Sequence, residues 1–144
     1  QAEAEAMIQL SSIFERTLDK LWPLPISANF REPVGTQDYA KIVKVPMDLS
    51  QMKARAKSFS YGGREAFICD LRLIRDNCYT YCKGRYPLLP PQADNLLIEA
   101  EKLLSSKHQE LMKLESSMGK WASVTNRGTP GTSYPGTPGR NTGG

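Results

Sequence analysis

The cysteines and the single histidine are the residues that could hold a metal ion or carry redox chemistry. Cys78 and Cys82 are four positions apart, so a helix would place both thiols on one face. A structural zinc site takes about four ligands, and the only histidine, His108, lies on another predicted helix. The spacing of the three cysteines, Cys69 included, does not match a disulfide framework, which is typical of proteins in a reducing compartment. We therefore predict no metal site and no cofactor.

Catalytic chemistry has less support still. An activated nucleophile needs an adjacent base and a group that orients this base, and no such set is legible in the sequence. The acidic residues instead lie three or four positions from basic ones, as Glu99 does from Lys102, which is typical of solvated helix faces. We predict a binding protein and not an enzyme.

The charge balance argues against a strongly basic nucleic-acid binder. The chain has 19 Lys and Arg against 15 Asp and Glu, a formal net charge of +4. Three of the cations lie beyond residue 119, where there is no acid, so residues 1–119 carry 16 against 15. A weak contact with DNA phosphates stays open as an accessory role for a basic group around the predicted second helix. This group is Lys41, Lys44, Lys53, Arg55, Lys57 and Arg64.

Nothing in the sequence predicts a membrane segment. No apolar run approaches the roughly 20 residues of a membrane span, and no basic start followed by an apolar stretch marks a signal peptide. We expect a soluble intracellular protein. Because the sequence begins at Gln1 and not at Met, we also expect it to be an excerpt from a longer chain.

The elements that position these side chains are helices, because apolar residues recur at intervals of three and four. The third predicted helix has the clearest period, and the second begins after Asp48, which can cap it with Gln51 three residues later. The last opens at Pro90-Pro91 and ends at Gly119, a plausible C-terminal cap. The first predicted helix spans residues 2–21, the second runs from Asp48 to near Lys57, the third begins after Gly63 and ends near Cys82, and the last runs from Pro90 to its cap at Gly119.

Two segments lack this periodicity. Residues 23–47 are rich in proline but carry enough apolar residues to pack down, and an ordered connection of this length is usually functional. Residues 120–144 are rich in Gly, Pro and Thr and should be a disordered tail. The pattern predicts an all-α four-helix bundle over residues 1–119, with a long structured loop between its first and second helices.

Several motifs occur together on this pattern, from the long loop to the end of the third helix. They are Phe30-Arg31-Glu32-Pro33-Val34, the run from Asp38-Tyr39 to Pro46-Met47-Asp48-Leu49, then Tyr61, Phe67, Asp70 and Asn77-Cys78-Tyr79-Thr80-Tyr81. This combination resembles the bromodomains, acetyl-lysine reading modules of chromatin proteins, over about residues 5–117. The resemblance implies a left-handed four-helix bundle whose first and third connections shape a pocket at one end.

The chain departs from this family at two places. Cys82 stands where the family has an Asn whose amide donates a hydrogen bond to the acetyl carbonyl, and a thiol is a weak donor. Losing such a bond costs about 1–3 kcal/mol, or roughly 5- to 150-fold in affinity. The first loop is also short, with four residues between Val34 and Tyr39. We therefore expect weak or altered binding of acetyl-lysine.

The resemblance also assigns roles to the remaining pocket residues. Tyr39 matches the tyrosine that holds a water against the acetyl carbonyl, and Tyr81 matches the aromatic residue before the anchor. A leucine near residue 88 matches the gatekeeper, with Leu88 and Leu89 as alternatives. The predicted acetyl-lysine pocket comprises Phe30, Pro33, Val34, Tyr39, Tyr81, Cys82, Leu88 and Leu89.

Two hypotheses of different classes follow. In the first, the chain is a nuclear, monomeric module of a larger chromatin protein that binds acetylated lysine on a histone tail or another acetylated protein. An acetylated lysine would be preferred because the charged form loses hydration in a predicted pocket that holds no acid. In a variant of this hypothesis, the small Cys82 leaves room for a bulkier acyl group. In the second, the fold serves as a protein interaction scaffold that has lost acetyl-lysine binding.

Overall fold

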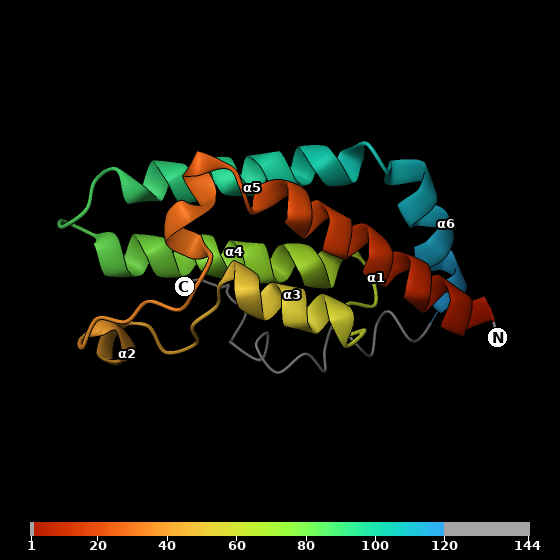
Figure 1. The fold of residues 1–144 in the computed structure, drawn as a ribbon, viewed down its shortest axis with the longest axis horizontal. Coiled ribbons are helices and arrows are strands. Elements are labelled where there is room, and N and C mark those ends of the chain that lie inside the picture. The colour runs from red at the N-terminus through yellow and green to blue at the C-terminus, as the bar shows by residue number, and fades with distance from the viewer. Residues whose placement is uncertain (1, 120–144) are drawn as a thin grey trace.

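All regular structure in the described part of the chain is helical. The computed structural model describes residues 2–119, and no strand occurs there, so the predicted all-α fold is confirmed. The tail that we predict to be disordered, residues 120–144, lies outside the described residues. In chain order the helices are α1 (Ala2–Leu21), the 3-10 helix η1 (Pro25–Phe30), α2 (Tyr39–Ile42), α3 (Leu49–Lys57), α4 (Arg64–Cys82), α5 (Leu89–Ser105) and α6 (His108–Met118) (Figure 1).

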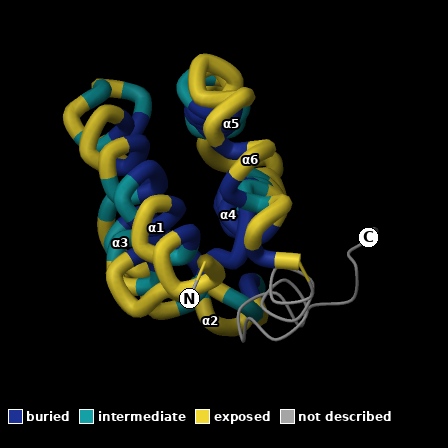
Figure 2. Tube along the Cα trace, turned by 90° about the vertical axis from the view of Figure 1, so that its right-hand side faces the viewer, coloured by how far each residue is buried: buried dark blue, intermediate teal, exposed yellow. Residues whose placement is uncertain are grey.

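The core forms where the apolar faces of these helices meet. Leu10, Phe14, Leu18 and Leu21 of α1 are buried, and the Phe14 ring stacks on that of Phe67 in α4, with centroids 4.7 Å apart. Tyr61, just before α4, meets both rings edge-on. Figure 2 shows the buried side of α1 turned toward the other helices and its exposed side turned outward. None of the helices within residues 2–119 has the length and apolarity needed to cross a membrane.

The last predicted helix is not continuous. It is broken at Ser106 and Lys107, where the Lys107 backbone leaves the helical region (φ −111°, ψ 18°) and α5 gives way to α6. Ser106 donates its hydroxyl to the Leu103 carbonyl at 2.6 Å, one of the local bonds by which serine competes with helix geometry. The break lets α6 turn across α1, with Leu111, Leu114 and Met118 buried.

The long connection is packed against the bundle, as predicted, and hydrogen bonds tie it to the end of the first helix and to α4. The Arg31 guanidinium donates to the Trp22 carbonyl at 2.7 Å, and the Asn77 amide of α4 donates to the Val45 carbonyl at 2.8 Å. At its end Asp48 accepts from the Gln51 backbone N–H at 2.9 Å, which confirms the predicted cap of α3. The Gln51 side chain returns to the same carboxylate at 3.0 Å. These ties hold the loop in place over one end of the bundle.

Candidate binding pocket

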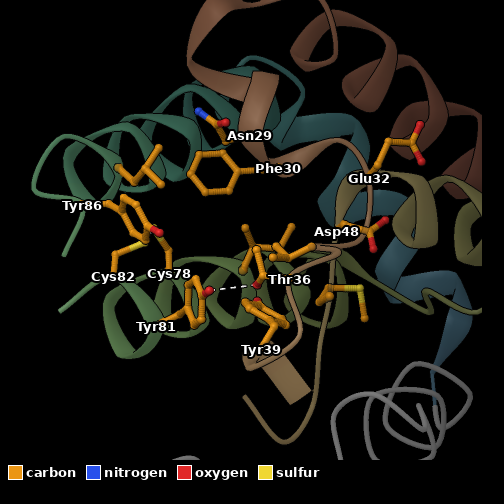
Figure 3. Close-up of a pocket in the computed structure, with 14 residues that line it drawn as sticks. Asn29, Phe30, Glu32, Thr36, Tyr39, Asp48, Cys78, Tyr81, Cys82 and Tyr86 are labelled. Carbon is orange, nitrogen blue, oxygen red and sulfur yellow. Dashed lines mark hydrogen bonds between the residues drawn. The ribbon is translucent and has the colours of Figure 1, made fainter. Parts of the chain in front are cut away.

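A cavity of about 200 Å³ opens at the end of the bundle where the long connection meets the end of α4 and the start of α5 (Figure 3). Six residues of the predicted pocket line it together: Phe30, Val34, Tyr39, Tyr81, Cys82 and Leu89. The other two do not line it: Pro33 is exposed on the loop, and Leu88 is 77% exposed. Of the two gatekeeper alternatives, the structure thus brings Leu89 to the cavity.

The cavity has apolar sides that the sequence only partly predicts. Phe30 is 8% exposed, and Met47 and Ile74 are also buried. These groups would contact an apolar ligand chain but supply no hydrogen bond. Besides the six predicted residues, the lining consists of Asn29, Glu32, Thr36, Met47, Asp48, Ile74, Cys78 and Tyr86.

Two acids in this lining correct the expectation that the pocket holds none. Asp48 and Glu32 both line the cavity. Asp48 is occupied by the cap of α3 and by the Ser50 hydroxyl, which donates to the same carboxylate. Figure 3 shows both carboxylates turned away from the middle of the cavity. Asp48 is buried but already engaged, and Glu32 is exposed on the loop, so the desolvation argument against a charged lysine no longer rests on an absence of acids.

The Tyr81 hydroxyl is engaged in a network that joins the two loops beside the cavity. It donates to Asp38 Oδ1 at 2.8 Å and lies 2.8 Å from the Thr36 hydroxyl. Arg85, after α4, donates to the other Asp38 oxygen at 2.8 Å and lies over the Tyr81 ring. Arg85 and then Tyr81 hold the pKa of Asp38 below its ordinary value, so this carboxylate is ionised at neutral pH. We call these four residues the inter-loop clasp.

Tyr39 has a hydroxyl that no residue within 2–119 engages by a hydrogen bond. Its ring meets that of Tyr81 edge-on, with centroids 4.8 Å apart. Burial raises the pKa of Tyr39 to about 12, with smaller contributions from Cys78 and Cys82. The phenol therefore keeps its proton at neutral pH and can donate a hydrogen bond into the cavity.

Two buried cysteines, Cys78 and Cys82, line the cavity. Cys78 Sγ lies 3.9 Å from Cys82 Sγ, and no disulfide joins them. Burial, followed by the neighbouring Cys82, raises the pKa of Cys78 to about 12. Within residues 2–119, no three His, Cys, Asp or Glu side chains gather as metal ligands would. The pair therefore contributes a weakly polar surface to the cavity.

Half of the basic group proposed for DNA contact is engaged in ion pairs within the bundle. Arg55 pairs with buried Asp70 at 3.1 Å, and Arg64 pairs with Glu115 of α6 at 3.1 Å. Lys53 lies 3.8 Å from Asp19 of α1. Any DNA contact by this group would therefore rest mainly on its other members, Lys41, Lys44 and Lys57.

Comparison with known proteins identifies the family to which this helical chain belongs. The pattern that defines the bromodomain matches residues 14–90. Transcription initiation factor TFIID subunit 1 of Dictyostelium discoideum is 35% identical over 116 residues, which cover 78% of this chain and 5% of that protein. The corresponding subunit of Oryza sativa subsp. japonica is 37% identical over 100 residues, 67% of this chain and 6% of that protein.

A third relative has the family in its name. The bromodomain-containing protein bet-1 of Caenorhabditis elegans is 44% identical over 62 residues, 42% of this chain and 7% of that protein. The chain belongs to the bromodomain family. It spans 5 to 7% of the length of these three relatives.

Proposed function

We propose that this chain is a nuclear, chromatin-associated binding module that recognises acetylated lysine on histone tails or other acetylated proteins. The observation that carries the proposal is the cavity itself, in which Phe30 and Leu89 form apolar sides and Tyr39 offers a protonated hydroxyl. The acetyl methyl and the lysine stem would contact these sides. The carbonyl would receive a hydrogen bond through a water held by Tyr39.

The affinity is expected to be weak because Cys82 has no amide to donate. Its thiol is buried, 4% exposed, and a thiol is a much poorer donor than an amide. The same substitution favours the second candidate function, a bromodomain-fold scaffold that binds a partner protein elsewhere on its surface. Occupancy of the cavity distinguishes the two functions.

The test is a titration followed by amide NMR shifts, with acetylated histone-tail peptides and their unmodified counterparts. Shifts confined to the acetylated set, and clustered at Val34, Tyr39, Cys82 and Leu89, would support the reader. Shifts with both sets, or at surfaces away from the cavity, would support the scaffold. Propionylated and butyrylated peptides belong in the same series, because equal or weaker binding of these would reject the proposal of a bulkier acyl ligand.

A further inference from the structure

The cavity contains a third tyrosine whose position bears on the missing amide donor. Tyr86 follows α4 by four residues and lines the cavity together with Tyr39 and Tyr81. A phenol is a good hydrogen-bond donor where a thiol is not. The question for the proposed function is which of the three hydroxyls is placed to donate directly to a bound acyl carbonyl.

Tyr81 is unable to do so, because its only proton is already donated. The Tyr81 hydroxyl donates this proton to the ionised Asp38 carboxylate, with 2.8 Å between the two oxygens. The Thr36 hydroxyl must therefore donate to the Tyr81 oxygen. Breaking this arrangement would leave Asp38 with Arg85 alone. The inter-loop clasp thus makes the Tyr81 hydroxyl a structural group.

Tyr86, in contrast, is held in place by its backbone and ring while its hydroxyl is left available. The backbone N–H groups of Arg85 and Tyr86 both donate to the Cys82 carbonyl, at 2.9 and 3.1 Å, so the turn winds tightly onto the end of α4. The Tyr86 ring lies nearly parallel to that of Tyr81, with centroids 6.2 Å apart. Its hydroxyl makes no hydrogen bond to any residue within 2–119.

The direction of this side chain places the hydroxyl beside the residue that replaces the anchor. In Figure 3 the Tyr86 ring stands at the side of the cavity next to Cys78 and Cys82, with its oxygen turned inward. The side chain is 46% exposed, so it stands at the mouth, where a lysine stem would enter. Arg85, its neighbour, pairs with Asp38 of the long connection at 2.8 Å beside the cavity.

We propose that the Tyr86 hydroxyl donates the direct hydrogen bond to the carbonyl of a bound acyl-lysine, in place of the amide that Cys82 lacks. The inference rests on the proposed function and adds to it a specificity-determining residue. Tyr39 keeps its role as the holder of a water, and Tyr81 its role in the inter-loop clasp. The ligand class is a neutral Nε-acyl-lysine, whose carbonyl can accept this bond.

The test removes one oxygen atom. Tyr86→Phe keeps the ring, and the oxygen it removes has no partner in the described part of the chain, so folding should be unaffected. Calorimetry with a multiply acetylated histone H4 tail peptide should show about 5- to 10-fold weaker binding. Tyr79→Phe is the matched control, since the Tyr79 hydroxyl donates to Asp94 at 2.5 Å outside the cavity lining. It should bind as the unchanged chain does.

A second background separates this inference from the proposed function. In Cys82→Asn an amide supplies the bond, so adding Tyr86→Phe should then cost less than about twofold. An equal loss in both backgrounds, or no loss from Tyr86→Phe in the original chain, would overturn the role of Tyr86 and leave acetyl-lysine binding standing. Binding by Cys82→Asn alone would also overturn it. Absence of binding by both the original chain and Cys82→Asn would overturn the proposed function and this inference together.

A spectroscopic readout gives an independent check on the bond. With a ¹³C label on the acetyl carbonyl, the bound peptide should show a lower carbonyl stretching frequency in the original chain than in Tyr86→Phe. Identical frequencies in the two complexes would contradict direct donation by Tyr86.

Discussion

Cys82 and Tyr39 contribute different chemistry to one cavity, and each supports a prediction. In the Tyr86→Phe background, Cys82→Asn should strengthen binding of an acetylated histone-tail peptide about tenfold or more, because there the amide replaces only a weak donor. The measurement is calorimetric titration of both proteins with the same peptide. Cys69→Asn is the control, since Cys69 is a cysteine of α4 outside the cavity lining. Unchanged binding by Cys82→Asn would contradict the argument that the anchor is missing.

Tyr39 supports a prediction on alkaline stability. Burial raises its pKa from 10.0 to about 12, so the folded chain holds this proton more tightly than the unfolded chain does. The contribution of Tyr39 to the free energy of unfolding is therefore complete below about pH 10 and lost as the pH rises toward 12. Tyr39→Phe has no such proton, so its stability relative to the original chain should improve over this interval. Denaturant unfolding at several pH values measures it; a constant difference would contradict the assignment.

At this scale the sequence predicts the side chains of the cavity better than their partners. Phe30, Tyr39 and Cys82 follow from motifs of adjacent residues, and each lines the cavity. The inter-loop clasp does not follow from them, because Asp38 meets Arg85 across 47 positions of chain, and no motif of adjacent residues indicates such a pairing. The sequence does not predict Tyr86 as a cavity residue either, because its position four residues after Cys82 does not indicate where its ring points.

Among the elements, α4 carries the most consequential buried polar group, Asp70. Its side chain is 0% exposed, and one oxygen accepts from Arg55 of α3 at 3.1 Å and from the Tyr61 hydroxyl at 2.7 Å. Its other oxygen has no hydrogen-bond partner among residues 2–119, and burial raises the pKa of this carboxyl despite the opposing effect of Arg55. This arrangement joins α3, α4 and the turn between them.

Removing the carboxylate should therefore destabilise the bundle. We expect Asp70→Ala to lower the free energy of unfolding by about 3 kcal/mol, because Arg55 and the Tyr61 hydroxyl both lose their acceptor inside the protein. Asp70→Asn, which keeps one carbonyl, should lose less. Asp76→Ala is the control, since the Asp76 side chain is 61% exposed and pairs with its neighbour Arg75. Urea unfolding gives all three values; equal stabilities of the two Asp70 variants would contradict the account.

Apolar periodicity is sufficient to predict some of the helices but not the break in the last one. The first three predicted helices match α1, α3 and α4, because a stripe of apolar residues defines α1 and α4 locally and the Asp48 cap marks the start of α3. Leucines recur at helical spacing on both sides of the break at Ser106 and Lys107, so periodicity alone predicts one continuous helix there. The break depends on α1, against which α6 packs after the turn.

In the whole molecule, the end of α4 and the start of α5, whose residues line the cavity, lie at the opposite end of the bundle from α6 (Figure 1). At the end away from the cavity, Glu115 of α6 accepts from the Arg64 backbone N–H at 2.8 Å and from its guanidinium at 3.1 Å. The first backbone donor of α4 is thus satisfied by another helix, and α6 is fixed across the bundle.

Stability and binding should consequently be separable. Glu115→Ala is expected to lower the free energy of unfolding by about 1–2 kcal/mol, because a partly buried charge-assisted bond and a cap are lost. The affinity for an acetylated peptide should stay unchanged at temperatures where the variant is folded. Glu99→Ala, which breaks an exposed pair with Lys102, should alter neither quantity. Thermal unfolding and calorimetry test this; a parallel fall in affinity would show that the two ends are coupled.

The position of the start of α1 determines where the protein can be attached to a surface without covering the cavity. The first turns of α1 lie against α6, with Ala2 and Glu5 beside Lys113 and Ser117, and none of these residues borders the cavity. A linker joined at residue 2 would therefore leave from the end of the bundle opposite the cavity. A biosensor surface or an affinity resin attached there presents the cavity to the solution, so immobilised and free protein should give the same binding isotherm.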